Sequence, residues 1–428
     1  LPAELVEFNA GNLPVSVSPD NIRSADLEGI DLSLPERPSI AILPFSTFDQ
    51  HDGQNILASG LVGDLTTRLA RTRWLFVTAR ASAQHFHVQS SDVTTIGRAL
   101  GVRYLLCGSV IRSANRFRLT ATLSDAEQGR EIWAERFDRS MDDLFAVQDE
   151  ICDMVAAAVE AEIELKERQK ALLRPLASLD AWSAYHRAND CLYRFSPDMH
   201  DQAEHFFQLA AKADPASSQV FAGLSFLHWQ RAFFAADDDR DSEIARAAEY
   251  GQHSVSLDPL DPAARWVLGR SALLKGDLDL AIDELTAAVD LNPNYARAHF
   301  SLGYGNLFRG ASTDVIDCAE RARRISPYDP MSFAYLSLHA EANVLAGEYG
   351  EATKWAKRAA RQRNAHYHIA AVAAWCHELA GDHEAALRYA ATLRQLRPNY
   401  SRAEFFRAYP YDDPMRSQIG GALSKLGF

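Results

Sequence analysis

The sequence contains few residues whose type and spacing could hold a metal or a cofactor. Four histidines and one cysteine gather near the carboxyl end of the chain: His366, His368, Cys376, His377 and His383. A helix-borne zinc site uses ligands four residues apart with an adjacent acid, and no pair here has that arrangement. The five cysteines of the chain are scattered, and none belongs to a CxxC motif. We therefore expect structural histidines and no cofactor, with a metal site as the alternative.

Other short motifs that could indicate catalysis have plainer explanations. Gly303-Tyr-Gly305 lies within a helical pattern, and "GLVGDL" at 60–65 lacks the Lys-Ser/Thr ending of a phosphate-binding loop. No serine or cysteine occupies a GxSxG elbow. The acidic run from Asp237 to Asp241 is expected to be a solvated loop, with calcium binding as the alternative. The sequence therefore predicts a protein that is not an enzyme.

Better candidates for binding are aromatic and arginine side chains at helical spacing in the second half of the chain. Such side chains give a binding site large contact areas and paired donors at a low cost in entropy. The predicted groove consists of nine residues: Phe226, Trp229, Trp266, Arg270, Arg297, Phe300, Tyr304, His368 and Trp375. Packing inside the fold is the alternative for the aromatic side chains. Arg270 and Arg297 are harder to explain as core, because an unpaired buried charge is costly.

The chemistry of these side chains also suggests a ligand. We expect Arg270 and Arg297 to meet an anionic group, while the aromatic side chains cover its apolar part. Replacing both arginines by alanine is then expected to abolish a ligand response and leave the melting temperature nearly unchanged.

The elements that position these residues are punctuated by prolines. Pro259, Pro293 and Pro327 are spaced 34 residues apart, and small residues such as Gly269 and Gly303 recur at a fixed offset before them. A 34-residue period built from two helices is the tetratricopeptide pattern. The pattern predicts six repeats, two of them irregular, with helices ending near five prolines: Pro215, Pro259, Pro293, Pro327 and Pro398. Such a solenoid is curved, and its first helices line a concave surface that holds peptides or small ligands.

The chain before the repeats follows a different pattern. A short apolar run at 38–45 and "LFVTAR" at 75–80 indicate strands, and 103–137 indicates three more strands joined by turns. Helical spacing is found at 54–72, at 92–101 and in a long stretch at about 141–170. We predict an α+β chain: a linker at 1–36, a small α/β domain at 37–140, a connecting helix at 141–179, and an all-α solenoid with a capping segment at 180–428.

Several stretches resemble a known family. They are "RPSIAILPF", "ASGLVGDLTTRLARTRWLFVTAR", "GRALGVRYLLCGSVIRSANRFRLTATLSDAEQGREIWAERFD", "DLFAVQDEI" and the closing "AEFFRAYPYDDPMRSQIGGALSKLGF". They are similar to the TolB-amino-terminal-like domain that precedes tetratricopeptide repeats in bacterial winged-helix transcription regulators and class III adenylate cyclases. The resemblance implies a regulatory region whose output domain, DNA-binding or cyclase, lies upstream of residue 1. Leu1 is accordingly expected to be a cut end.

Composition narrows the remaining function classes. A net charge of −13 argues against nucleic-acid binding by this portion, so DNA is expected to be contacted only through the missing domain. The sequence contains no window of about twenty apolar residues, so it predicts no membrane helix. The scattered cysteines suit the reducing environment of the cytoplasm. We therefore predict a sensory region of a transcription regulator that binds a small molecule, peptide or protein in its groove, with a homodimer as an option. The alternatives are the regulatory region of an adenylate cyclase and an exported structural adaptor.

Overall fold

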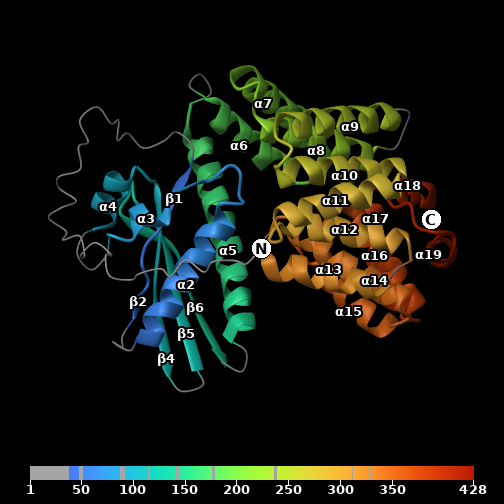
Figure 1. The fold of residues 1–428 in the computed structure, drawn as a ribbon. Coiled ribbons are helices and arrows are strands. Elements are labelled where there is room, and N and C mark those ends of the chain that lie inside the picture. Colours follow the sequence, from blue (N-terminus) through green and yellow to red (C-terminus); the bar gives the residue numbers. More distant parts are fainter. Residues whose placement is uncertain are drawn as a thin grey trace, which may run out of the picture.

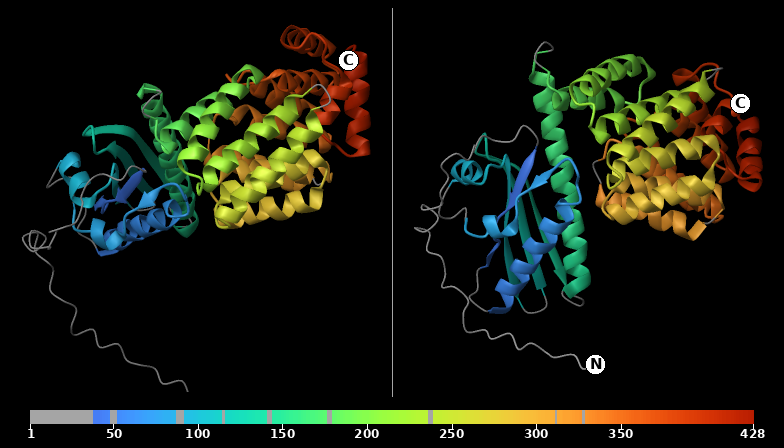
Figure 2. Two further views of the ribbon diagram at one scale, coloured as in Figure 1. Left: turned by 90° about the horizontal axis from the view of Figure 1, so that it is seen from above. Right: turned by 45° about the horizontal axis from the view of Figure 1, so that its top comes forward.

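The computed structural model describes residues 38–47, 52–86, 92–113, 116–140, 144–175, 179–235, 239–310, 312–326 and 329–428. The predicted linker at 1–36 and Pro327 lie outside these residues. A mixed sheet with its helices stands at one side of the molecule, a long helix runs along it, and an array of helix pairs follows (Figures 1 and 2). We refer to these as the α/β part and the solenoid.

The sheet of the α/β part contains both parallel and antiparallel pairings. Its strands are β1 (Ser39–Ile42), β2 (Ser46–Thr47), β3 (Phe76–Val77), β4 (Tyr104–Ser113), β5 (Arg116–Asp125) and β6 (Arg130–Ser140). The order is β3-β1-β4-β5-β6, with β2 also paired to β4. The pairs β1–β3 and β1–β4 are parallel, whereas β4, β5 and β6 form an antiparallel meander. The strands predicted at 38–45, at 75–80 and within 103–137 are therefore confirmed, and β2 was not predicted.

Helices cover both faces of this sheet. They are α2 (Asp52–Leu69), α3 (Arg80–Ala83), α4 (Val93–Leu100) and α5 (Leu144–Leu173). Because successive side chains of a strand point to opposite faces, Leu106 packs with α2 and α5 while Leu105 packs with α3 and α4. Helix α4 ends at Gly101, whose φ of 62° is left-handed, as its sequence predicted. The 30-residue α5 then leads to the solenoid.

In the described part of the chain, the solenoid consists of six helix pairs and a closing segment. The pairs are α6/α7 (Ala181–Leu192, His200–Ala213), α8/α9 (Ser218–Phe234, Arg240–Leu257), α10/α11 (Pro262–Lys275, Leu278–Leu291), α12/α13 (Ala296–Phe308, Ser312–Ile325), α14/α15 (Ser332–Leu345, Tyr349–Ala360) and α16/α17 (Tyr367–Leu379, His383–Leu396). The closing segment contains α18 (Arg402–Ala408) and α19 (Asp413–Lys425). The first helices of the pairs are α6, α8, α10, α12, α14 and α16.

The prolines end the helices as predicted. Pro215, Pro259, Pro293 and Pro398 each lie two residues beyond the last residue of α7, α9, α11 and α17. Proline cannot donate the backbone hydrogen bond that a further helical turn requires. Since these four helix ends fall where the sequence placed them, the repeat interpretation of the second half is supported by the fold itself.

The acidic run at 237–241 differs from its prediction. Arg240 and Asp241 are not in a loop but begin α9, so the inserted residues lengthen α8 and α9 to 17 and 18 residues. Arg240 donates to the carbonyl oxygens of Leu274, at 3.2 Å, and Arg407, at 2.7 Å. The insertion therefore lets the second repeat reach the closing segment. Residues 236–238 lie outside the described part.

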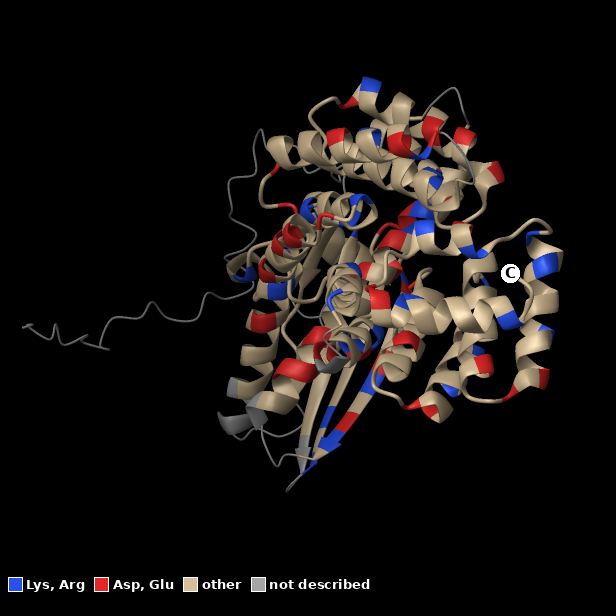
Figure 3. Cartoon of the chain, turned by 90° about the vertical axis from the view of Figure 1, so that its right-hand side faces the viewer, with Lys and Arg blue, Asp and Glu red and all other residues tan. Residues whose placement is uncertain are grey.

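Charged residues of both signs are interspersed over the helices of the solenoid (Figure 3). Among the described residues, no helix is long and apolar enough to cross a membrane.

Small residues allow helices of neighbouring pairs to approach closely. A Cβ placed on Gly223 of α8 would lie 2.2 Å from a ring carbon of Phe207 on α7, well inside the van der Waals contact distance. The Phe207 ring is fully buried and cannot rotate away. Gly421 of α19, in contrast, has open space where a Cβ would stand.

We expect Gly223→Ala to lower the free energy of unfolding by about 1–3 kcal/mol, because the added methyl overpacks a close helix crossing. The matched control Gly421→Ala should raise it by about 0.5–1 kcal/mol, since alanine favours a helix interior over glycine. Urea unfolding followed by circular dichroism measures both. Equal effects of the two variants would contradict this account of the crossing.

Candidate ligand-binding site

Two cavities lie on the first-helix face of the solenoid. The larger, of about 290 Å³, is bounded by the α/β part, by α5, by α6 and by the amino-terminal halves of α8, α10 and α12. The smaller, of about 50 Å³, lies between the carboxyl-terminal halves of the same helices and reaches residues 408–410 of the closing segment. We call them the junction cavity and the inner cavity.

The nine predicted groove residues are divided between these places. Phe226, Trp266 and Arg297 line the junction cavity. Trp229, Arg270, Phe300 and Tyr304 line the inner cavity. His368 and Trp375 are fully buried, line neither cavity and contribute to the packing between repeats. The residues that sequence periodicity placed in one groove thus belong to two separate cavity walls and a core.

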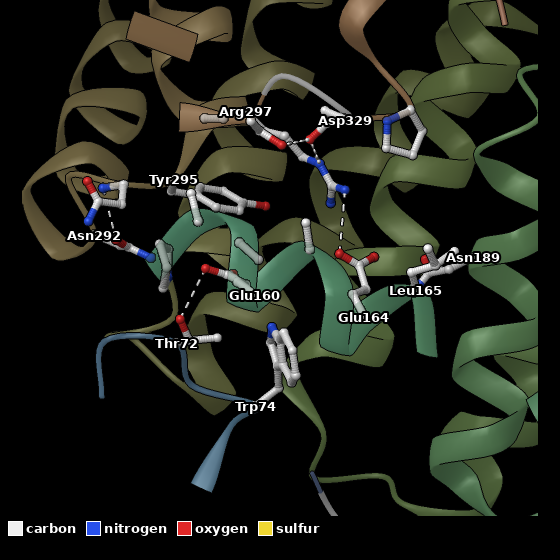
Figure 4. Close-up of a pocket in the computed structure, with 18 of the residues that line it drawn as sticks. Thr72, Trp74, Glu160, Glu164, Leu165, Asn189, Asn292, Tyr295, Arg297 and Asp329 are labelled. Atoms are coloured by element: carbon white, nitrogen blue, oxygen red, sulfur yellow. Dashed lines mark hydrogen bonds and ion pairs between the residues drawn. The ribbon is translucent and has the colours of Figure 1, made fainter. Parts of the chain in front are cut away.

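Two carboxylates of α5 face the solenoid across the junction cavity. Glu160 and Glu164 lie one helical turn apart and point toward Tyr295 and Arg297 (Figure 4). Glu160 accepts a hydrogen bond from the hydroxyl of Thr72 at 3.2 Å. Burial, with a smaller contribution from the charge of Glu164, raises the pKa of Glu160 to about 7. The cavity therefore holds a carboxyl group that changes its charge near neutral pH.

Arg297 is neutralised by carboxylates of this chain. Its guanidinium lies 3.9 Å from Glu164 and 3.6 Å from Asp329, and it also donates to the hydroxyl of Tyr193 (Figure 4). The guanidinium carbon stands 4.5 Å from the centre of the Tyr193 ring. Arg297 thus joins α5, α6 and the start of α14, and its charge is already balanced.

The remaining walls of the junction cavity combine aromatic rings with an unpaired polar side chain. The centre of the Trp182 ring lies 6.0 Å from that of Trp74 and 5.7 Å from that of Tyr185. His186 is 1% exposed, and neither of its ring nitrogens has a hydrogen-bond partner among the described residues. Burial lowers the pKa of His186 to about 3, so the ring is neutral and can accept a hydrogen bond from a ligand donor through one nitrogen.

The inner cavity is built around Arg270. Its guanidinium carbon lies 3.6 Å from the centre of the Trp229 ring and 5.5–5.7 Å from the rings of Phe226, Trp266 and Phe300. One Nη donates to the Ser301 hydroxyl at 3.4 Å, while Nε has no partner in the described chain. Burial lowers the pKa of Arg270 to about 9, which still leaves it charged at neutral pH.

A buried carboxylate lies near the inner cavity on α14. Glu341 accepts hydrogen bonds from Tyr304 at 2.8 Å, from Ser337 at 2.7 Å and from Tyr411 of the closing segment. Burial raises its pKa to about 7. Tyr409 packs beside Tyr304, with ring centres 5.9 Å apart. The closing segment is therefore held against the first helices by both hydrogen bonds and aromatic packing.

The histidines near the carboxyl end are used in local contacts. His368 pairs with the Tyr400 hydroxyl at 2.7 Å, His377 with Asp382 at 3.1 Å and His383 with Glu378 at 2.6 Å. His366 packs among aromatic rings, including that of Phe333 at 5.2 Å. Within the described ranges, no group of three or more histidine, cysteine, aspartate or glutamate side chains could hold a metal.

Sequence reasoning missed the side of the junction cavity that comes from outside the repeats. Trp74, Glu160, Glu164 and His186 are on a loop of the α/β part, on α5 and on α6. The available signal was a pair of glutamates four residues apart on the predicted long helix, away from its apolar stripe. That signal is weak, because such pairs are usual on solvent-exposed helices.

Comparison with known proteins adds a regulatory context. Residues 36–154 match the second domain of HilA/YgeH-like transcriptional regulators. Over 235 residues the chain is 30% identical to "Putative adenylate cyclase 3" of Rhizobium meliloti strain 1021; the alignment covers 55% of this chain and 40% of that protein. The chain thus spans less than half the length of this curated relative.

Solved structures with some likeness include three bacterial proteins. PilF of Pseudomonas aeruginosa is 15% identical, covers 56% of this chain and 96% of its own, and has a TM-score of 0.36. A thermophilic TPR protein of Thermus thermophilus is 20% identical; the match covers 43% of this chain and 92% of that protein, with a TM-score of 0.34. TolB of Acinetobacter baumannii is 18% identical; the match covers 31% of this chain and 29% of TolB, with a TM-score of 0.24. The resemblance to the TolB-amino-terminal-like domain therefore stays a prediction. The regulator match and the array of helix pairs together indicate a regulatory or protein-interaction role.

Proposed function

We propose that this chain is the sensory region of a bacterial transcription regulator. It catalyses no reaction itself, works in the cytoplasm, and controls DNA binding by a separate domain. The division into 37–140, 141–179 and 180–428 is part of the proposal. Its support is the match of residues 36–154 to a domain of transcriptional regulators, together with a cavity that the α/β part and the solenoid share.

The observation that carries the proposal is the composition of the junction-cavity wall. The wall of this cavity is formed by the loop at Thr72–Trp74, the helix α5 and the first helices of four repeats, so a ligand there can bridge the two parts. Direct contacts between the two parts include ion pairs, such as Arg73 with Asp258 at 2.9 Å and Arg324 with Glu150 at 3.5 Å, and the packing of Trp74 against Trp182. A ligand that prefers one arrangement of the two parts will shift the population toward it.

Helix α5 provides the route for this shift. Its Glu167 accepts hydrogen bonds from the Tyr104 hydroxyl of the sheet at 2.6 Å and from the Trp182 indole of α6 at 2.9 Å. One buried carboxylate thus ties the sheet, α5 and the first repeat together. A displacement of the solenoid relative to α5 is therefore transmitted to the α/β part.

The cavity favours a small ligand that carries hydrogen-bond donors. Glu160 and Glu164 supply carboxylate oxygens, and His186 supplies an unpaired nitrogen. Trp74 and Tyr185 offer ring faces that can cover an apolar or cationic body. A volume of about 290 Å³ suits a small molecule better than a folded partner protein.

A second candidate is the regulatory region of an adenylate cyclase. The name of the Rhizobium meliloti relative favours it, and the same cavity would then control cyclase output. No contact in the described residues favours the exported structural adaptor.

The test replaces Glu160 and Glu164 by glutamine in the full-length protein within its own host. Glutamine keeps the volume and the Thr72 contact but removes the charge. We expect transcript levels of the regulated genes to lose their ligand response by at least about 10-fold, since each charge-assisted hydrogen bond contributes about 1.5–3 kcal/mol. RNA sequencing measures this, and cellular cyclic AMP is measured in the same cultures.

Glu351→Gln, at an exposed position of α15 that pairs with Lys354, is the matched control and should respond normally. A change in cyclic AMP without a direct change in transcripts would favour the cyclase alternative. A normal response of the double variant in both measurements would contradict a sensory role of the junction cavity.

A further inference from the structure

Arg270 is a buried cation without an anionic partner. It is 6% exposed, and within the described residues no carboxylate pairs with it. A buried carboxyl near the inner cavity, Glu341, is already held by Tyr304, Ser337 and Tyr411. Removing a charge from water costs several kcal/mol unless a counter-charge or good hydrogen bonds replace the water.

The protein replaces that water only in part. The face of the guanidinium stacks on Trp229, which gives a favourable cation–π contact. The edge of the guanidinium, where its N–H groups point, has one long hydrogen bond to Ser301 and an unpaired Nε. This edge is the part of arginine that binds a planar anion through two parallel hydrogen bonds.

The surroundings of this edge decide the class of anion. Around it the inner cavity is walled by Phe233, Leu273, Leu274, Met331 and Phe333. Such a wall offers no further charged donors, which a phosphate or sulfate with its larger hydration cost would need. A carboxylate matches the guanidinium fork with a single charge, and its remaining atoms must be apolar to contact the wall.

The size of the cavity limits the body of the ligand. A volume of about 50 Å³ suits a short alkyl chain or a single ring better than a long acyl chain. Ala408, Tyr409 and Pro410 of the closing segment form part of the wall, so a bound molecule contacts α8, α10, α12 and the closing segment together.

We propose that the inner cavity binds a small monocarboxylate with a short apolar or single-ring body, held by Arg270 and Ser301. This site is separate from the junction cavity and does not depend on the ligand proposed there. It assigns to Arg270 a role that neither core packing nor the regulator match provides.

The test titrates the purified chain with benzoate, butyrate and acetate by isothermal calorimetry, with benzamide as the neutral isostere of benzoate. We expect benzoate or butyrate to bind at least about 30-fold more tightly than benzamide, because an unpaired charge in a dry cavity contributes about 2 kcal/mol to a charge-assisted hydrogen bond. Arg270→Gln should weaken carboxylate binding by a similar factor. The matched control Arg265→Gln, on the same helix but paired with Glu284, should leave it within about 2-fold.

Several outcomes would overturn the proposal. The first two are equal affinities of the chain for benzoate and benzamide, and carboxylate binding by Arg270→Gln that is as tight as that of the wild type. The other two are no detectable binding of carboxylate up to about 10 mM, and tighter binding of inorganic phosphate or chloride than of any carboxylate. The comparison of benzoate with benzamide uses only the wild-type chain, so it decides the question even where Arg270→Gln folds poorly. Unchanged benzoate binding by the Glu160→Gln and Glu164→Gln double variant separates this site from the junction cavity.

Discussion

Replacing Arg297 by alanine should lower the free energy of unfolding by about 3–5 kcal/mol, one of the largest effects expected of any single substitution in this chain. The guanidinium lies between Glu164 and Asp329, and it donates to Tyr193. The side chain of Asp329 is 7% exposed, so its charge would be left in the protein interior with no cation beside it. Breaking a buried pair from one side costs more than the pair contributes, because the remaining charge stays desolvated.

Urea unfolding measures this effect, and a second substitution tests its cause. Asp329→Asn in the Arg297→Ala background should recover part of the loss, because it removes the unpaired charge. Arg388→Ala, at an exposed pair with Glu384, should change stability by less than about 1 kcal/mol. A loss below about 1 kcal/mol for Arg297→Ala would show that solvent or rearrangement neutralises Asp329.

This prediction revises an expectation from sequence. From the sequence, Arg270 and Arg297 were expected to play the same role, and replacing both by alanine was predicted to leave the melting temperature nearly unchanged. We now expect a loss of stability when Arg297 is replaced, because Arg297 is part of an ion-pair network. Only Arg270 has the unpaired charge that sequence reasoning assigned to both.

Local rules explain why the helix and strand positions could be predicted. Proline is excluded from a helix beyond its first turn, so Pro215, Pro259, Pro293 and Pro398, each after a helical pattern, indicate helix ends without any tertiary information. Alternation of apolar residues likewise indicates β5, whose Leu119 faces Phe137 on the next strand. The solvated loop predicted at 237–241 is wrong for Arg240 and Asp241, which begin α9, because the start of a helix and a loop can have similar polar composition.

The site depends on contacts that periodicity cannot reveal. A repeat position shows that Tyr304 and Arg297 project from a first helix, but not what covers them. Tyr304 is covered by Tyr409, and Arg297 by Glu164, each more than 100 residues away in sequence. Whether a first-helix side chain lines a cavity or a core is decided by α5 and the closing segment, which lie outside the repeat pattern.

The second large effect concerns Glu341 and pH. The pKa of its carboxyl group is about 7 in the folded protein because of burial, compared with an ordinary value of 4.5. Between these two values the carboxyl of Glu341 binds more protons in the folded state than in the unfolded state, so its contribution to stability falls as pH rises from about 4.5 to 7 and stays low above it. A shift of this size corresponds to about 3 kcal/mol.

Glu341→Gln removes the titrating group. Its one oxygen can accept from Tyr304 and Ser337 at the place of Oε1, and its amide group can donate to the Tyr411 hydroxyl at the place of Oε2. We therefore expect the variant to exceed the wild type in free energy of unfolding by about 1–3 kcal/mol at pH 8, and to differ little from it at pH 5. Urea unfolding of both proteins at several pH values between 5 and 8 measures the difference.

The comparison isolates Glu341 because every other titrating group, including Glu160, is present in both proteins. The groups that face the carboxyl are hydroxyls: Tyr304 of α12, Ser337 of α14 and Tyr411 of the closing segment. None of them carries a charge between pH 5 and 8, so a pH-dependent difference can only come from ionisation of Glu341 itself. A difference that is constant with pH, or a variant that is less stable at pH 8, would mean that the three hydroxyl donors outweigh the cost of burying the charge. In that case the ionised carboxylate is what holds Tyr411, and with it the closing segment, against the first helices of the solenoid.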